Sequence, residues 1–326
     1  MDHLKDHSSI DLSIILPTKD RIPILFKTLE TLLTALKEIN CEILIIDNSI
    51  SSDIHLPQNL QRNFIILLKN LGNRNSVFAS RNFGATIAKS EQLLFLDDDI
   101  LVTPESLRFA MDFQKKNPQT ASNVSWQYAP ELLDKMKKSG FGRFLIHSGF
   151  TSMRELYGVN KWKENAIFES GEVASFFLCI QRKTFAETGG YEERHLHEGT
   201  DRSLIENLVK KGIKMYINSR LLVFHNEEDR LEIRNWMERK KRVGEIIANS
   251  NFIGDQAEKK LDYSPLKSVA FNMIYFLRSP IILFMKIFFF RIRVLDKFSF
   301  KLLSLLTGAY MQKGYSTELK RNKKTS

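Results

Sequence analysis

The chain has 326 residues, 43% of them hydrophobic, and a formal net charge of +10 at pH 7. A chain of this length and apolar content can bury one large α/β domain or two smaller ones. Its two cysteines, Cys41 and Cys179, lie beside apolar runs without metal-type spacing, which argues against a zinc site and a disulfide framework. The basic excess indicates an anionic partner, either nucleic acid, an anionic membrane surface or a phosphorylated substrate. The polar first residues contain no apolar signal-peptide core, so we expect a reducing, cytoplasmic setting.

Apolar strand-like runs alternate with helix-like segments over the first hundred residues. The runs at 12–16, 43–46, 64–68 and 93–96 are apolar throughout, and helical spacing is found over 22–39 and 79–88. Thr103 and Pro104 form the N-cap and first turn of a further helix. Strands without polar alternation are typical of a parallel sheet that is covered by helices on both faces.

Three consecutive acids, Asp97, Asp98 and Asp99, follow the run at 93–96. Because side chains alternate along a strand, Asp97 and Asp99 are expected on one side and Asp98 on the other. A divalent cation such as Mg²⁺ would offset their repulsion, although a solvated acidic loop is the alternative. Ligands of parallel sheets bind beyond the carboxyl ends of the strands, where Asp47 is also expected, so a functional site is favoured.

The second half of the chain is less regular. The sequence predicts a strand at 173–180, a helix over 201–211 that Gly212 ends, and two strands at 213–217 and 221–224, the second ending at His225. A basic amphipathic helix is expected over 231–248. Residues from about 121 to 168 show no clear periodicity, and their structure is not predicted.

The C-terminal region is rich in Phe, Ile and Leu but is interrupted by charges, so it contains no apolar run long enough to predict a membrane-spanning helix. Cations at helical spacing are predicted to share one helical face; they are Lys286, Arg293, Lys297 and Lys301. The other face is predicted to carry the apolar residues Phe288, Phe289, Leu295, Leu302 and Leu303. This pattern is typical of a helix that lies in a membrane interface. A helix packed on the rest of the protein, with its cations solvated, is the alternative.

Five ordered stretches together resemble a family 2 glycosyltransferase of the GT-A fold. They are SIILPTKDR, EILIIDNS, NLGNRNSVFASRNFGATIAKSEQLLFLDDD, GGYEERHLHEGTDRSLIENLVKKGIKMYI and LLVFHNE, between about residues 10 and 228. The resemblance implies an α/β fold with a mostly parallel sheet. It divides the chain into a polar tail at 1–10, a Rossmann-like nucleotide-sugar-binding half at 11–128, an acceptor-binding half with a variable segment at 129–228, and basic, Phe-rich amphipathic helices at 229–326.

The resemblance also implies residues that bind the donor. They are Pro17, Thr18, Arg21, Asp47, Arg81, Asn82 and Asp97, with Asp47 accepting a hydrogen bond from the nucleotide base. A carboxylate suits that role because it is only an acceptor. Without the resemblance, Pro17 and Thr18 would be a strand-stopping turn, Asp47 an Asx-turn and Arg81 an ordinary helix start.

A metal site and a catalytic base are implied in the same way. Asp99 is expected to ligate Mg²⁺ or Mn²⁺ directly, with Asp97 beside it on the ribose or the metal and Asp98 pointing away. His225 matches a histidine that completes the metal site in many relatives, but it could equally be a satisfied structural group. Asp201 matches the general base of an inverting displacement. Its alternative is a helix-start acid that favours the helix dipole.

The sequence departs from the family pattern near this base. Thr200 replaces the usual glutamate, which leaves Glu198 as the nearest upstream acid, and the acceptor loop reads Val173-Ala174-Ser175-Phe176. Thr200 is also a good N-cap, so it supports the alternative for Asp201.

The expected function is transfer of a sugar from a UDP- or dTDP-sugar to a lipid-linked glycan or polysaccharide. We expect the enzyme to be cytoplasmic and peripheral, at the inner face of the cell membrane. A catalytically degenerate binding module is the alternative. A nucleotidyltransferase is disfavoured because PTKDRIPIL lacks a Gly-rich phosphate loop. Nucleic acid is not an expected partner, since aromatic and basic residues are not interleaved on one strand-like segment.

Overall fold

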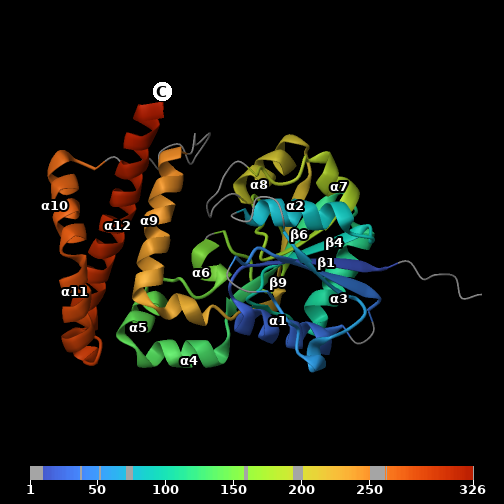
Figure 1. The fold of residues 1–326 in the computed structure, drawn as a ribbon, viewed down its shortest axis with the longest axis horizontal. Coiled ribbons are helices and arrows are strands. Elements are labelled where there is room, and N and C mark those ends of the chain that lie inside the picture. Colours follow the sequence, from blue (N-terminus) through green and yellow to red (C-terminus); the bar gives the residue numbers. More distant parts are fainter. Residues whose placement is uncertain are drawn as a thin grey trace, which may run out of the picture. The chain divides into compact units, whose positions relative to one another are not determined.

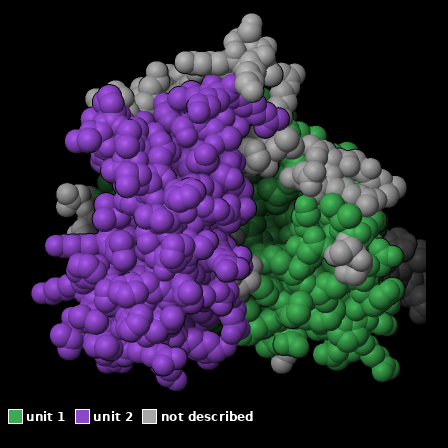
Figure 2. Space-filling model, turned by 60° about the vertical axis from the view of Figure 1, so that its left-hand side comes forward, with its two compact units in different colours: residues 1–129, 152–196, 200–226 green, residues 130–151, 197–199, 227–326 purple. Residues whose placement is uncertain are grey.

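The computed structural model describes residues 10–36, 39–50, 53–70, 76–157, 161–193, 201–249, 261 and 263–325. Contacts divide the chain into two compact units (Figure 2). The first comprises residues 1–129, 152–196 and 200–226, and the second comprises 130–151, 197–199 and 227–326. Residues 130–151, which the sequence places in the acceptor-binding half, therefore group with the C-terminal helices.

The first unit is built on a nine-stranded sheet with the order β3-β2-β1-β4-β8-β6-β9-β5, and β7 pairs with β9. Its strands are β1 Leu12–Thr18, β2 Cys41–Asp47, β3 Ile65–Lys69, β4 Gln92–Leu96, β5 Ile100–Leu101, β6 Thr120–Tyr128, β7 Ile167–Ser170, β8 Phe177–Gln181 and β9 Lys214–His225. The first four are parallel, as their apolar runs predict. β8 pairs antiparallel with both β4 and β6, so the sheet becomes mixed in its second half.

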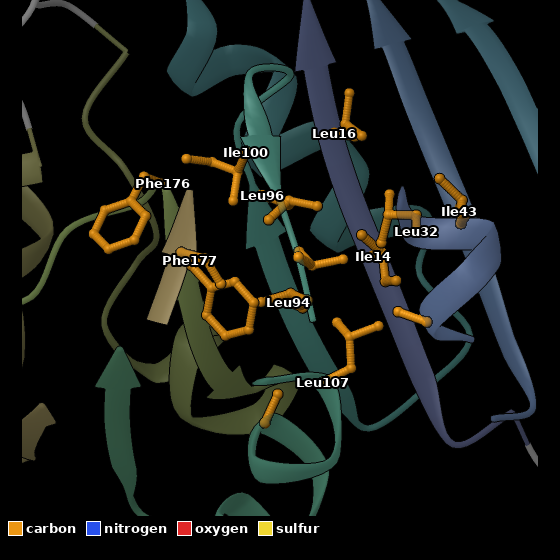
Figure 3. Close-up of a cluster of buried hydrophobic side chains, with 14 of the residues drawn as sticks. Ile14, Leu16, Leu32, Ile43, Leu94, Leu96, Ile100, Leu107, Phe176 and Phe177 are labelled. Atoms are coloured by element: carbon orange, nitrogen blue, oxygen red, sulfur yellow. The ribbon is translucent and has the colours of Figure 1, made fainter. Parts of the chain in front are cut away.

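Helices cover both faces of this sheet, which confirms the predicted α/β class (Figure 1). They are α1 Ile22–Ala35, α2 Val77–Ile87, α3 Pro104–Lys116, α6 Met153–Tyr157, α7 Arg182–Glu187 and α8 Asp201–Lys210. α1 and α3 pack over Ile14 and Leu94 on one face (Figure 3). α2, α7 and α8 pack over Ile15 on the other. A Cβ on Gly84 would lie 2.4 Å from Ile15 Cγ2, so this glycine lets α2 approach β1 closely.

Several local predictions are confirmed. Thr103 caps α3 in a reciprocal capping box with Ser106, and Pro104 is its first residue. Gly212 adopts a positive φ of 68° just after α8.

The two strands predicted at 213–217 and 221–224 are instead one strand, β9, because its pairing with β6 continues across a register shift at Val124/Ser125.

The second unit is helical. It contains α4 Pro130–Lys138, α5 Gly140–His147, α9 Ile233–Asn249, α10 Pro265–Phe276, α11 Arg278–Phe284 and α12 Asp296–Thr325. α12 lies between α9 and the α10–α11 pair (Figure 1). Glycines allow the close approach of α9 and α12, since a Cβ on Gly314 would lie 1.9 Å from the Lys241 carbonyl oxygen. Arg143 of α5 binds Asp296 through Nε and NH2, both at 2.7 Å, and so fixes the start of α12.

The prediction of one cationic helical face from Lys286 to Lys301 is wrong. A π-helical turn at Met285–Phe289 follows α11, and Ile292 then has extended backbone (φ −114°, ψ 104°), which interrupts the helical hydrogen-bond ladder. Lys286 therefore precedes the break, while Lys297 and Lys301 lie on α12. Within the described ranges, no individual helix has the length and apolarity to cross a bilayer. Pro265–Phe276 and Arg278–Phe289 meet that test only together, as a pair bent by 65°.

Candidate functional site

The acidic triplet lies at the carboxyl edge of the parallel strands, directly after β4. Asp98 is buried, and its carboxylate accepts hydrogen bonds from Thr18 Oγ1 and Arg21 NH1, both at 2.7 Å. The pKa of Asp98 is raised to about 7, mainly because the carboxylate is buried. The nearby Asp99 also raises this pKa, and Arg21 partly offsets both effects. Asp98 was expected to point away from the site, with Asp97 and Asp99 together on the other side. Its carboxylate instead contacts Thr18 and shares Arg21 with Asp99, whereas Asp97 binds Arg81.

Arg21 is the cation that holds this part of the triplet together. Its NH2 group lies 2.9 Å from Asp99 Oδ2, while NH1 binds Asp98. One guanidinium thus spans two adjacent carboxylates and offsets their mutual repulsion. The side chain of Arg21 remains 22% exposed, so it faces the site as well as the protein.

Asp47 ends β2 at the same edge of the sheet. Its Oδ1 accepts the backbone N–H of Ser49 at 2.7 Å, which is the Asx-turn geometry, and its Oδ2 accepts Lys69 Nζ at 2.8 Å. Asp47 is buried, and Lys69 also binds Asp53. The hydrogen bond to Asp47 is the largest cause of the raised pKa of Lys69. Asp47 is thus a fixed carboxylate at the strand end where the sequence places the nucleotide base.

Asp99 and His225 come together where β5 pairs with the end of β9. Ile100 is the register partner of His225, and His225 Nδ1 lies 3.6 Å from Asp99 Oδ1. The imidazole packs edge-on against Trp126, at 4.5 Å between ring centroids. Together with Glu227, two residues along the chain, these residues each offer one ligand atom within 4.8 Å of the others.

This donor set fits a divalent ion. Two carboxylates and an imidazole supply oxygen and nitrogen ligands, and hard cations such as Mg²⁺ and Mn²⁺ accept carboxylate oxygens readily. All three residues are buried. The residues therefore could hold a metal beside the triplet.

Arg81 of α2 links the triplet to Asp201, the first residue of α8. Its NH2 group lies 2.5 Å from Asp97 Oδ1, and its NH1 group lies 3.6 Å from Asp201 Oδ1. The guanidinium is buried and lies over the rings of Phe78 and Tyr191. Burial alone would lower the pKa of Arg81, but Asp97, Tyr191 and Asp201 raise it overall. The cation is therefore permanently charged between two carboxylates that are each about one-third exposed.

Ser175 fixes Asp201 from its other side. Its backbone N–H donates to Asp201 Oδ2 at 3.2 Å, its hydroxyl donates to Asp201 Oδ1, and the same hydroxyl lies 2.6 Å from Tyr191 Oη. Ser175 is buried, so the carboxylate is oriented by groups that cannot move freely. Thr200 and Glu198, on which the family comparison near Asp201 depends, lie outside the described residues.

Asn82 and Pro17 occupy structural positions. The Asn82 side chain accepts the N–H of Tyr191 at 2.9 Å and donates to its carbonyl at 2.8 Å, so it fastens α2 to the turn that carries Tyr191. Pro17 lies within β1 as the register partner of Ile46. The predicted nucleotide contacts of these two residues stay predictions.

Comparison with known proteins places this geometry in a family. The family model described as "Glycosyl transferase family 2" matches residues 13–180, more than half of the chain. The chain belongs to glycosyl transferase family 2. It is 25% identical over 183 residues to an uncharacterized glycosyltransferase of Haemophilus influenzae, covering 55% of each chain. It is 24% identical over 225 residues to the O-antigen biosynthesis protein RfbC of Myxococcus xanthus, covering 66% of this chain but only 17% of that one.

A solved structure, GalNAc-T7 with UDP, GalNAc and Mn²⁺, superposes with a TM-score of 0.49 at 14% identity, covering 78% of this chain and 53% of that one. The chain spans about half the length of the first of these curated relatives and a sixth of the second.

In this family 2 glycosyltransferase, the structure gathers most of the predicted site residues at one sheet edge. Asp97, Arg81 and Asp201 form one connected group, and Asp98, Arg21 and Asp99 form another. Sequence reasoning did not assign Lys69, Tyr191 or Glu227 to the site, nor a contact of Ser175 with Asp201. Lys69 could have been found as the cation that ends β3 beside Asp47, since parallel strands end at one edge. Local sequence carries no comparable signal for Tyr191.

Proposed function

We propose that the protein transfers a sugar from a UDP- or dTDP-sugar, with inversion at the anomeric carbon, to a hydroxyl of a lipid-linked glycan or polysaccharide. The observation that carries this proposal is the Arg81 bridge. It joins Asp97, at the strand-end edge where donors bind, to Asp201, at the start of a helix from the other half of the unit. An acid on each side of one buried cation suits a reaction whose donor and acceptor meet between them.

The donor side of the site supports a nucleoside diphosphate. Asp47, held by Lys69, would accept the base N–H. Asp99, His225 and Glu227 would hold Mg²⁺ or Mn²⁺. Asp97, which the sequence also assigned to the metal, binds Arg81 in this structure. When bound, such an ion neutralises charge on the departing diphosphate. Arg21 and Arg81 supply further positive charge at the same edge.

Asp201 would act as the general base. It would take the proton of the acceptor hydroxyl as that oxygen bonds to the anomeric carbon, while the bond from this carbon to the diphosphate oxygen breaks on the opposite face. The Ser175 N–H and hydroxyl orient the carboxylate, and its one-third exposure leaves it accessible to an acceptor. Arg81 places a permanent positive charge 3.6 Å from one oxygen of this carboxylate.

A thermal-shift screen of nucleotide sugars, with and without Mn²⁺, tests the donor proposal, since a ligand that binds the folded state raises the unfolding temperature by mass action. One UDP- or dTDP-sugar should stabilise the protein in a metal-dependent way, and slow donor hydrolysis should accompany it. Loss of hydrolysis in Asp99→Ala would support the metal role. Stabilisation without any turnover, with all acceptors tried, would favour a catalytically degenerate binding module, which the Thr200 replacement suggests.

A further inference from the structure

An apolar surface runs along the outer side of α10, α11 and the turn that follows. Thirteen of the nineteen exposed large hydrophobic residues in the described part of the chain lie between Leu266 and Leu305, a stretch of only 40 residues. We call this stretch the apolar ridge. Leu266 is 82% exposed, Phe276 is 80% exposed and Val294 is 90% exposed. A soluble protein rarely exposes so many large apolar side chains together without a partner.

The outward residues of α10 share one helical face. Leu266, Val269, Met273 and Phe276 recur at intervals of three and four, so they form one stripe. The opposite face is also apolar and packs inside the second unit, where the ring of Phe271 lies against Gly308. The same arrangement continues beyond α10, with Ile282 and Met285 buried and other apolar residues exposed; these are Leu283, Phe284, Ile287 and Phe288. Helix packing therefore uses one face and leaves the other face uncovered within this unit.

Positive charge accompanies the apolar ridge, and negative charge is nearly absent from it. Between residues 263 and 317 the sequence has eight cations, which are Lys267, Arg278, Lys286, Arg291, Arg293, Lys297, Lys301 and Lys313. The one acid in that range is Asp296, and Arg143 neutralises it through two hydrogen bonds. Two copies of such a surface would repel each other, whereas an anionic surface would attract it.

The dimensions favour insertion over spanning. α10 and the helical stretch Arg278–Phe289 have 12 residues each, or about 18 Å at 1.5 Å per residue. A bilayer core is about 30 Å thick, so neither segment crosses it alone. The two segments meet at a bend of 65°, so they do not form one straight span.

We propose that the apolar ridge inserts into the headgroup and upper acyl region of an anionic lipid bilayer, with the exposed cations Arg291, Arg293 and Lys297 on the lipid phosphates. This assigns a partner to the second unit that does not depend on the glycosyl transfer proposed above. The proposal also specifies which surface binds the membrane. The sequence alone predicted a single helical face from Lys286 to Lys301, which the break at Ile292 interrupts.

Vesicle flotation of the full chain tests the proposal. Vesicles of phosphatidylcholine with 30% phosphatidylglycerol, as the probe, should carry the protein upward at low salt, and binding should weaken at 0.5 M NaCl. The double substitution Phe276→Ser with Phe288→Ser should reduce binding by about 10-fold or more, because it removes two large apolar side chains from the inserted face. The matched control, Leu156→Ser with Val209→Ser, alters two apolar residues of the first unit that are 54% and 59% exposed, and it should bind like the wild type.

A site-specific probe guards against a folding artefact. Both native cysteines are buried, so a Phe276→Cys variant can be labelled with an environment-sensitive dye at one position. Its emission should shift to the blue and rise several-fold with anionic vesicles, whereas a dye at Val209→Cys should not respond. The proposal is overturned if the wild type does not float, if the dye at position 276 stays in water, or if light scattering shows a stable dimer that the Phe276→Ser and Phe288→Ser pair dissolves without any lipid binding.

Discussion

The bridge of Arg81 between Asp97 and Asp201 can be tested by a double-mutant cycle. Arg81→Met keeps the length and apolar stem of the side chain but removes its charge, and Asp97→Asn removes the opposite charge with little change in shape. The Arg81 NH2–Asp97 Oδ1 contact is 2.5 Å, and Arg81 is 6% exposed in its side chain against 33% for Asp97. Hydrogen bonds to charged groups contribute about 1.5–3 kcal/mol. The partial exposure of Asp97 places the expected coupling at the lower end, about 1.5–2 kcal/mol.

The two single substitutions should differ in cost. Asp97→Asn leaves a buried guanidinium without its nearest counter-charge, so we expect a loss of about 2–3 kcal/mol in the free energy of unfolding. Arg81→Met leaves carboxylates that solvent can reach, and should cost less. Urea denaturation of the four proteins in EDTA, at pH 7.5, gives the coupling energy. A coupling below about 0.5 kcal/mol would refute the bridge, because independent sites already add to within that margin.

Three further predictions concern single side chains. The raised pKa of Asp98 means that the folded state binds its proton more tightly than the unfolded state does. The free energy of unfolding should therefore fall as pH rises from about 4 to 8 in EDTA, and Asp98→Asn should flatten that decline in urea titrations. An unchanged slope would contradict the assignment. Lys69→Met should weaken UDP binding by about 3- to 10-fold in calorimetry, since it frees the Asp47 carboxylate, and equal affinity would count against a donor-base role. Gly314→Ala should destabilise the second unit by about 1–3 kcal/mol, because its Cβ would meet the α9 backbone, while Gly171→Ala, with nothing within 4 Å, should be neutral in the same thermal melts.

The first four strands and the gathering of acids at their ends could be predicted from the sequence. Each strand is an apolar run that ends in a polar residue, and parallel strands bring such residues to one edge. Asp47 and Asp97 therefore fall together without any knowledge of the intervening loops. The start of α3 could also be predicted from the sequence, because Thr103 and Pro104 form a local capping signal.

The remaining features depend on contacts that local sequence does not specify. Ser175 reaches Asp201, and Tyr191 reaches Ser175, only because β8 inserts antiparallel between β4 and β6, a pairing set by the whole sheet. Asn82 binds the backbone of the distant residue Tyr191 through both ends of its amide, a contact that local sequence does not indicate. The helical spacing of Lys286 and Lys297 was real in the sequence, yet the break at Ile292 separates them, and periodicity alone does not reveal such a break.

In the proposed reaction, Asp201 performs the chemistry while the strand-end acids hold the donor. Paired measurements on Asp201→Asn test it most directly, with donor affinity by calorimetry and sugar transfer or donor hydrolysis in the presence of Mn²⁺. We predict that the donor dissociation constant stays within about 3-fold of the wild type while turnover falls by about 10³-fold, as expected for loss of a general base. Turnover within 10-fold of the wild type, with the donor still bound, would contradict the role of Asp201 as the general base.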